Sequence, residues 1–580
     1  MKADFDFNRI IYRRPRSFQE TEIKRFIGVD TESYTDGKPF MICTDSGDIF
    51  KPLQVPACFF RRKFKDCHFV TYNLKYDSGS LISFLPDDNK RELWEKNKTL
   101  WYEYTITYVP HKNLAFKRGR NKVEFWDIAQ YFEMSLDNAA KKYLGEGKTE
   151  IETKSFTREY VRRNFKKLSA YCVHDALLTR RLSEFLKDAL NRFGVQVTRL
   201  YSGAYLSYTY FKARCRIIDV WRYWDKYKDV LRYACEAYQG GKFEVYARGS
   251  FTGFEYDIVS AYPYEIANLI DIHKSKVIKS KKYIDEAQYA LIRCRLKIDK
   301  ESPHPVGIQI RGVNIYPMGE YYHTLTKNEF DYMIDEGFDL TILSAFWLVS
   351  RVIRYPYRKT VMELYKMKKH YKDKDASLYH VSKVMLNGFY GKFLQLTEKD
   401  ECLKAGAGWN PIYGAVITAN TRLKMCALQK IAGGACLAVH TDSIITENPI
   451  PDKLLSGELG GLSLEMSGDG CMIMCGMYDM CDKTAYRGIE FKKDQSWRDV
   501  LSKNRGLSVL QFPQLRVISW RQAAAWGLLD KINLFENFPK NINLNADIKR
   551  TWFKKVKAGD LLTRLDRSAP RVHVENESPY

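Results

Sequence analysis

Long apolar runs are absent from this chain, and their absence excludes several classes of protein. No stretch of about 18 consecutive apolar residues occurs, and the N-terminal residues MKADFDFNRIIYRRPRSF contain no apolar core of signal-peptide length. Repeats, low-complexity segments and the G-x-x-x-x-G-K-[ST] loop of P-loop nucleotide-binding proteins are also missing. We therefore expect a soluble, intracellular protein that is not a P-loop ATPase.

Cysteine spacing indicates neither disulfides nor a zinc site. The 13 cysteines are an odd number without a repeated C-x-x-C, which suits reduced thiols in a reducing compartment. The densest group, Cys471, Cys475 and Cys481, has spacings that fit no common zinc pattern. We expect buried thiols at these positions.

Positive charge and aromatic residues, by contrast, are abundant. The 93 Lys and Arg against 70 Asp and Glu give a formal net charge of +23, and 14% of the residues are aromatic. This balance favours a polyanionic partner such as nucleic acid, although a merely basic enzyme would share it. The length of 580 residues predicts three or four domains rather than one core.

Strands mixed with helices over the first ~190 residues predict an α/β domain. Residues 24–43 are typical of two strands around a turn, and residues 68–85 of a strand that runs into a helix. Residues 156–190 have helical periodicity behind a Thr cap. Further along, residues 357–393 predict two basic helices joined by KDKDAS, and residues 414–434 a helix closed by glycines.

Four carboxylates in the N-terminal third form the first candidate site. Asp30 and Glu32 lie two apart on an apolar strand, so both side chains point to one face, as also happens on many solvated strand edges. Asp77 begins a predicted helix, and Asp175 lies one helical turn after Tyr171. Four acids on three elements suit two hard cations about 3.5–4 Å apart, which would activate a water and stabilise the leaving oxygen of a phosphodiester. Tyr171 could orient that water.

In order and context, the D-x-E, N-x-x-x-D and Y-x-x-x-D patterns resemble the three motifs of DnaQ-like 3′→5′ exonuclease domains. The stretch MSLDNAAKKYLG, with Ser135 and Leu136, resembles the extra motif by which protein-primed polymerases hold the primer terminus. We interpret the neighbouring acid Asp127 as structural. The resemblance implies a ribonuclease-H-like fold, metal ligation by Asp30, Glu32, Asp77 and Asp175, and DNA contacts by Asn73, Ser135 and Leu136.

Two further carboxylates lie far apart in the sequence. Asp257, in DIVSAYP, ends a strand rich in aromatic and β-branched residues, and the carbonyl of Ile258 next to it could also reach a metal. Asp442 lies in the turn of CLAVHTDSIITE, between two apolar strands. If these strands are neighbours in one sheet, Asp257 and Asp442 form a second two-metal site.

The helix between them carries KVMLNGFYGK. Its Lys383, Asn387 and Tyr390 are spaced to share one face, which is also the pattern of an ordinary amphipathic helix. A lysine on that face can neutralise triphosphate oxygens, and Tyr390 with Gly388 can pack the nascent base pair.

Together, D-x-x-S-x-Y-P, K-x-x-x-N-x-x-Y-G and the aspartate-bearing hairpin resemble motifs A, B and C of family B DNA polymerases. YQGG resembles the Y-x-G-G joint between exonuclease and polymerase domains, and TANTR a template-contacting element of the same family. The motifs keep the family order from about Phe26 to Lys493. The chain thus resembles the protein-primed family B DNA polymerases found in viruses, phages and organellar plasmids.

The resemblance implies an α/β multidomain (α+β) enzyme with palm, fingers and thumb, which transfers deoxynucleotides with two Mg²⁺ (or Mn²⁺) ions per active site. Its partners would be a DNA primer–template, dNTPs and a terminal priming protein, and the enzyme would be a monomer. Tyr262 would stack under the sugar and exclude a ribose 2′-OH. The nucleotide contacts would be Ser260, Tyr262, Lys383, Asn387 and Tyr390, and further DNA contacts Tyr238, Gly240, Gly241, Thr418, Arg422, Lys483 and Tyr486.

Two departures from the family pattern stand out. His440 occupies the place of the first aspartate of the usual D-T-D, and imidazole is a poor ligand for Mg²⁺. We expect activity to survive through Asp442, with an altered metal preference. The expected K-x-Y motif has one extra residue in KTAY, which leaves Lys483 and Tyr486 as candidates for gripping the primer.

Motif spacing predicts an insertion between motifs A and B and a reduced insertion between motifs B and C. Between motifs A and B there is room for the insertion on which a terminal protein docks, and residues 304–322 would belong to it. From Asn387 to Asp442 little room remains for the insertion that encircles the template, so we expect weak strand displacement. The expected order is exonuclease 1–190, connector and joint 191–241, palm 242–300, insertion with palm strands 301–350, fingers 351–400, palm 401–490 and thumb 491–580.

Two alternatives stay open from the sequence. The polymerase could start without a terminal protein, or the chain could be a nucleic-acid-binding 3′→5′ exonuclease whose polymerase site is impaired, as His440 hints. A protein partner with a Ser, Thr or Tyr nucleophile would distinguish the first alternative. The intact Asp257, Lys383 and Asp442 argue against the second.

Overall fold

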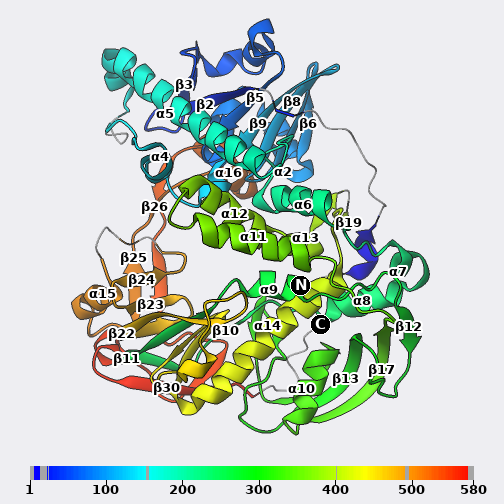
Figure 1. Cartoon of the computed structure of the whole chain (residues 1–580). Helices are drawn as coiled ribbons and strands as arrows, with labels where there is room; N and C mark the ends of the chain where they lie inside the picture. The colour runs from blue at the N-terminus through cyan, green and yellow to red at the C-terminus, as the bar shows by residue number, and fades with distance from the viewer. Residues whose placement is uncertain are drawn as a thin grey trace.

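Three large sheets, each with its own helices, make up the protein (Figure 1). The computed structural model describes residues 6–12, 22–23, 25–151, 156–399, 401–489, 491 and 495–572. Within these residues, no helix is both long and apolar enough to cross a membrane.

The N-terminal domain is built on an eight-stranded sheet with strand order β4-β3-β2-β5-β9-β8-β7-β6. Its centre, β2 (Arg25–Ser33), β5 (Cys67–Thr71) and β9 (Asn121–Asp127), is parallel, and β3 (Pro39–Thr44) runs antiparallel beside β2. The other strands are β4 (Ile49–Phe50), β6 (Lys98–Trp101), β7 (Tyr104–Val109) and β8 (Asn113–Arg118).

Helix α5 (Arg158–Arg192) packs across β2, as the blue and cyan elements of Figure 1 show. The approach is close because β2 carries Gly28, where a Cβ would lie 1.8 Å from the carbonyl oxygen of Ala176. The helix begins behind Thr157, whose side chain accepts the N–H of Tyr160, so the predicted Thr cap is confirmed. Helix α4 (Leu136–Leu144) packs beside α5, whereas α1 (Leu74–Leu81) packs with Ile27 and Val29 of β2 in a separate apolar core.

The second sheet has the order β10-β20-β21-β11-β22-β23-β24 and corresponds to the predicted palm. Its strands are β10 (Lys242–Val245), β11 (Ala247–Ile258), β20 (Cys436–Thr441), β21 (Ser443–Thr446), β22 (Leu462–Met474), β23 (Met477–Met480) and β24 (Lys483–Tyr486). Helix α14 (Pro411–Ala432) packs on β20 and β21, and its end at Gly433 confirms the predicted glycine stop. The late strand β30 (Leu565–Pro570) pairs with β11, so residues expected in the thumb complete the palm sheet.

Residues between the predicted motifs A and B form a four-stranded sheet of their own, β12-β17-β13-β16. Strands β12 (Lys276–Lys279), β13 (Tyr289–Ile298), β16 (Gly319–Thr326) and β17 (Asp339–Val349), with α10 (Lys327–Asp335), enclose a separate apolar core. This inserted unit therefore begins at β12 rather than at residue 301. Within the stretch 304–322, β14 (Ile308–Ile310) and β15 (Val313–Ile315) form a hairpin.

Helices α11 (Arg358–Tyr371) and α12 (Ala376–Gly388) lie between the N-terminal domain and the palm sheet, and they pack on each other (Figure 1). Helix α12 also contacts α6 (Gly203–Arg214). After α13 (Tyr390–Phe393), the chain forms the strands β18 (Leu396–Lys399) and β19 (Cys402–Ala405) before α14 begins. This short hairpin occupies the place of the predicted reduced insertion.

The C-terminal region reaches back to the N-terminal domain. Helix α16 (Trp520–Trp526) places Trp520 against Tyr108, with ring centroids 5.0 Å apart. Nearby, Asn533 donates to Ser80 Oγ at 3.1 Å. These contacts position the hairpin of β26 (Leu515–Val517) and β27 (Phe535–Asn537) beside the N-terminal sheet.

Candidate active sites

The four N-terminal carboxylates converge in one cleft. Asp30 and Glu32 on β2, Asp77 on α1, and Asp175 on α5 line a cavity of about 1020 Å³ together with Tyr171. Burial raises the pKa of Asp30 to about 7, and repulsion from Asp175 adds to the shift. The pKa values of Glu32, Asp77 and Asp175 are also raised, first by burial.

This acid cluster fits a divalent cation. Asp175 is 1% exposed, and its Oδ1 has no hydrogen-bond partner among the residues that the structure describes. A cation would replace the missing donor and remove the repulsion that raises the pKa values, and carboxylate oxygens are the ligands that hard cations prefer.

Lys148 also belongs to the cluster, although sequence reasoning missed it. Its Nζ lies 2.5 Å from Asp175 Oδ2 and 5.1 Å from the ring centroid of Tyr171. Burial lowers the pKa of Lys148, but the attraction of Asp175 and Tyr171 outweighs burial and raises it overall. The stretch GEGKTEIE has no strand or helix periodicity that could have placed Lys148 near the carboxylates. The only sequence signal was a lysine after a glycine-bearing turn.

Replacing Lys148 by methionine should slow 3′→5′ degradation of a labelled single strand by about 10- to 100-fold, the usual cost of losing a group that orients catalytic ligands. The ammonium holds Asp175 and Tyr171 in place, and methionine keeps its length without its charge. Primer extension should stay unchanged. Lys141→Met, which removes an exposed pair with Asp137, serves as the matched control. Equal degradation rates for Lys148→Met and the control would contradict this role.

The predicted primer-holding residues line the same cavity. Asn73, Ser135 and Leu136 are all part of its wall. Ser135 caps α4, and its Oγ accepts the N–H of Asn138 at 3.2 Å. Asp127 accepts backbone N–H groups of Asn73, Leu74 and Ala129 at 3.0–3.1 Å, which supports its interpretation as structural.

The far wall of this cavity comes from the C-terminal hairpin β26–β27. Leu515 and Phe535 are 47% and 53% exposed there, and Arg516 and Val517 lie beside them. No local pattern could have assigned these residues to the cleft, because more than 300 residues separate them from Asp175. The docking of α16 and Asn533 on the N-terminal domain brings them there.

The second carboxylate pair is also brought together. Asp257 is the cross-strand partner of Ser443, and the N–H of Ile258 donates to the carbonyl of Asp442 at 2.9 Å. Thr441 has a φ of 66°, which forms the tight turn that carries Asp442. Burial raises the pKa of Asp257 to about 7, with repulsion from Asp442 as the second cause, so this pair also fits a cation.

His440 packs among aromatic rings rather than beside a carboxylate. Its ring centroid lies 4.8 Å from that of Phe243 and 5.5 Å from that of Tyr478. Burial lowers the pKa of His440 to about 4, and the nearby charge of Lys483 adds to the shift. The imidazole is therefore neutral at pH 7 and adds no charge to the Asp257–Asp442 pair.

Three tyrosines connect the predicted motifs A and B with the YQGG joint. The rings of Tyr262 and Tyr390 are 4.5 Å apart, and the hydroxyls of Tyr390 and Tyr238 are 3.1 Å apart. Gly241 packs on the turn of Asp442, since a Cβ there would lie 2.6 Å from Thr441 Cγ2. The joint thus borders the Asp257–Asp442 site.

The predicted common face of Lys383, Asn387 and Tyr390 needs a correction. Helix α12 ends at Gly388, and Tyr390 begins the next helix, so its side chain turns toward Tyr262. Lys383 and Asn387 are exposed and line a cavity of about 710 Å³ between α12 and the N-terminal domain.

A second lysine, Lys368 on α11, lies beside motif A and was missed in the sequence. Its Nζ donates to Ser260 Oγ at 3.0 Å. Burial lowers the pKa of Lys368, and repulsion from Lys383 adds to the shift. Lys368 therefore places an ammonium group beside Ser260, where it could bind a phosphate oxygen.

The prediction that Thr418 and Arg422 contact the template directly is wrong, since both side chains are 0% exposed. The guanidinium of Arg422 donates to the carbonyls of Pro305, Gln239 and Gly240 at 2.8–3.0 Å and pairs with Glu329 at 2.6 Å. The hydroxyl of Thr418 donates within α14 to Gly414 and Ala415. Arg422 instead anchors the YQGG joint to α14.

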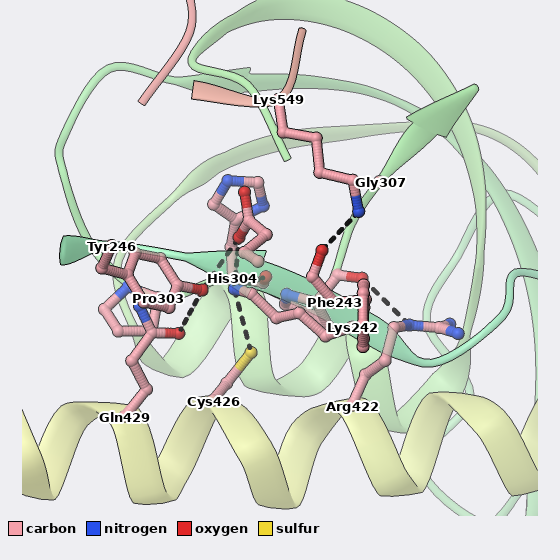
Figure 2. A network of polar contacts seen from close by, with 12 residues as sticks. Lys242, Phe243, Tyr246, Pro303, His304, Gly307, Arg422, Cys426, Gln429 and Lys549 are labelled. Atoms are coloured by element: carbon pink, nitrogen blue, oxygen red, sulfur yellow. Dashed lines mark hydrogen bonds and ion pairs between the residues drawn. The ribbon is translucent and has the colours of Figure 1, made fainter. Parts of the chain in front are cut away.

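Figure 2 shows the same side of the palm sheet, with Arg422, Cys426 and Gln429 projecting from α14 toward β10. Lys242 on β10 is buried and donates to the carbonyl of His304 at 3.1 Å. From the C-terminal region, Lys549 donates to the carbonyl of Phe243. The buried Lys242 and the partly buried Lys549 therefore fasten β10 to the segment at His304 and to the C-terminal region.

The predicted primer-gripping pair lies on β24. Lys483 is half-exposed and contacts both carboxylate oxygens of Glu255 at 2.8 and 3.0 Å. Tyr486 is 47% exposed and stacks on Phe491. Both side chains keep a solvent-facing surface.

Comparison with known proteins agrees with this architecture. A model of the family described as DNA polymerase type B, organellar and viral, matches residues 148–403. The DNA polymerase of Acidianus bottle-shaped virus (isolate Italy/Pozzuoli) is 24% identical over 421 residues, which cover 65% of this chain and 61% of the relative. A probable DNA polymerase of Podospora anserina is 21% identical over 496 residues, covering 67% of this chain and 40% of the relative. The chain thus spans less than two thirds of either relative.

Solved structures of phi29 DNA polymerase share the fold. The complex with primer-template DNA and incoming nucleotide substrates superposes with a TM-score of 0.63 at 14% identity, covering 90% of this chain and all of that one. The complex with single-stranded DNA has a TM-score of 0.64 at the same identity and coverage. The α/β multidomain fold expected from the sequence is thereby confirmed.

Proposed function

We infer that this chain belongs to the organellar and viral type B DNA polymerases and is a template-directed DNA polymerase with a 3′→5′ proofreading exonuclease. The observation that carries this proposal is the junction of Asp257 and Asp442 beside the Tyr262–Tyr390–Tyr238 cluster. A second carboxylate cleft in a separate domain supports the exonuclease. The two activities are therefore assigned to separate sites.

At the polymerase site, Asp257 and Asp442, with the carbonyl of Ile258, would hold two Mg²⁺ ions. When bound, these ions activate the primer 3′-oxygen and stabilise the charge on the α-phosphate and the leaving pyrophosphate. Lys368 and Lys383 neutralise the triphosphate as point charges. Tyr262 would stack under the deoxyribose and exclude a 2′-hydroxyl, and Tyr390, whose ring centroid lies 4.5 Å away, would brace its ring.

At the exonuclease site, Asp30, Glu32, Asp77 and Asp175 would hold the metal ions. The chain's own contribution is to position the reactants: Lys148 fixes Asp175 and Tyr171, and the Tyr171 hydroxyl orients the attacking water toward the terminal phosphodiester. Asn73, Ser135 and Leu136 hold the last nucleotides of the primer.

The element that this enzyme replicates is proposed to be viral or mobile, with a terminal protein as primer. The matched relatives come from a virus and from a fungus. The inserted unit from β12 to β17 has its own core and offers a separate surface for a priming protein. The short β18–β19 hairpin leaves the template unenclosed on that side, which supports weak strand displacement.

The experiment that tests this function incubates purified protein with a labelled primer–template and Mg²⁺ or Mn²⁺. We expect extension that needs all four dNTPs, and 3′ degradation when dNTPs are omitted. Degradation without extension under either metal would contradict the polymerase and favour an exonuclease with an impaired second site. Strong strand displacement through a long duplex by the protein alone would contradict the weak displacement expected from the short β18–β19 hairpin.

Substituting His440 by aspartate should change the ratio of extension rates with Mg²⁺ and Mn²⁺ by about tenfold. The new carboxylate would add a hard ligand two residues from Asp442, where the native imidazole is neutral and packed against Phe243. His440→Asn, which resembles aspartate in size but brings no charge, is the control. Equal Mg²⁺ to Mn²⁺ ratios in both variants would show that residue 440 does not tune the metal.

A further inference from the structure

A thiol lies directly behind the exonuclease carboxylates. Cys172 is on α5, next to Tyr171, and is 0% exposed. Its Sγ and one carboxylate oxygen from each of Asp30 and Glu32 all lie within 4.8 Å of one another. Among the described residues, these three are the acidic, histidine or cysteine side chains whose ligand atoms lie close enough together to bind one ion.

The thiol interacts with these acids and is not merely close to them. Burial is the main cause that raises the pKa of the Cys172 thiol, and repulsion from Asp30 and Glu32 adds to the shift. A second observation in the same cleft points to a ligand, namely the buried, partnerless Oδ1 of Asp175, three residues further along the same helix face. Asp30, Glu32 and Asp175 therefore offer oxygen donors in the cleft, and the buried sulfur of Cys172 adjoins the first two of them.

Ligand chemistry decides which ions such a set prefers. Mg²⁺ selects oxygen and gains nothing from a thiol, whereas Zn²⁺, Cd²⁺ and Co²⁺ bind thiolate sulfur and carboxylate oxygen together. Sulfur raises the affinity for these borderline and soft ions without raising that for Mg²⁺.

We propose that Asp30, Glu32 and Cys172 form a binding site for a thiophilic divalent cation such as Zn²⁺, inside the exonuclease cleft. On binding, the Sγ–H bond breaks, the sulfur–metal bond forms, and the proton passes to the buffer. The ion then occupies the carboxylates that the exonuclease reaction needs. Among the described residues, no cysteine forms such a group with Asp257 and Asp442, so extension continues while proofreading stops.

The binding part of this proposal can be tested without activity. Co²⁺ added to the purified full-length protein should produce a thiolate-to-metal charge-transfer band, and Cd²⁺ a corresponding ultraviolet band. Cys172→Ser should abolish both bands and weaken Zn²⁺ binding at least about tenfold, because a hydroxyl is close to a thiol in size but is a poor ligand for these ions. Cys58→Ser, which alters another buried thiol of the same domain, should keep them.

If Cys172→Ser fails to fold, Glu32→Gln provides the second test, because it leaves the thiol in place and should still lose the Co²⁺ band. No band in the native protein, or a band that survives in Cys172→Ser, would overturn the site.

The consequence for activity rests on the proposed exonuclease and is measured separately. With Mg²⁺ in excess, micromolar Zn²⁺ should inhibit 3′ degradation by the native protein at least about tenfold more strongly than by Cys172→Ser. Extension in the same tube should respond alike in both proteins. A Co²⁺ band without any degradation at all would refute the exonuclease while leaving the metal site intact. Equal Zn²⁺ inhibition of degradation in both proteins would overturn the inhibitory role.

Discussion

Asp442→Asn should abolish dNTP-dependent primer extension, with a loss of at least about 10³-fold, equivalent to about 4 kcal/mol of transition-state stabilisation. Asp442 and Asp257 are the carboxylates at the joined ends of β21 and β11. An amide keeps the shape and hydrogen bonds of the turn but removes the negative charge that binds a cation. Primer extension with a labelled oligonucleotide gives the rate.

The proposed exonuclease activity of the same protein provides the internal reference for this prediction. Because its carboxylates lie in a separate cleft, degradation by Asp442→Asn should equal that of the native protein. Asp469→Asn, an exposed acid of the same sheet, should leave both rates unchanged. Extension that persists in Asp442→Asn, or falls equally in Asp469→Asn, would refute the assignment of the polymerase site. The reciprocal variant, Asp30→Asn, should lose degradation and keep extension.

Arg422→Met should destabilise the palm by about 3–5 kcal/mol, because it leaves the carboxylate of Glu329 buried without its partner. The same change removes the donors that hold the carbonyls of Gln239 and Gly240. Thermal unfolding should begin about 10 °C lower, and extension should fall because the joint that carries Tyr238 loosens. Differential scanning calorimetry and limited proteolysis measure the change.

Two further variants separate charge burial from the loss of contacts. The double variant Arg422→Met with Glu329→Gln should recover part of the stability, since neither group is then charged. Lys430→Met, on the same helix, breaks an exposed pair with Glu336 and should cost less than about 1 kcal/mol. If Arg422→Met unfolds at no lower temperature than Lys430→Met, the buried Arg422–Glu329 pair does not stabilise the palm as its contacts indicate.

The sequence by itself determined the local features and their order along the chain. Period-two spacing placed Asp30 and Glu32 on one strand, a Thr cap began α5, and glycines ended α14. Such signals depend on residues within one or two turns of each other, so they remain readable without knowledge of the fold. The partnership of Asp257 and Asp442 was also predictable, because motif order and a strand before each acid limited the choices.

Tertiary structure alone decided which of these residues face a ligand and which are buried. Arg422 matched a template-contacting motif, yet contacts with Pro305 and Glu329, about a hundred residues away, enclose it completely. Lys148 and Cys172 acquire their surroundings only when α5 packs on β2. Burial, ion pairing and pKa shifts arise from neighbours distant in the chain, and no local periodicity records which segments will meet.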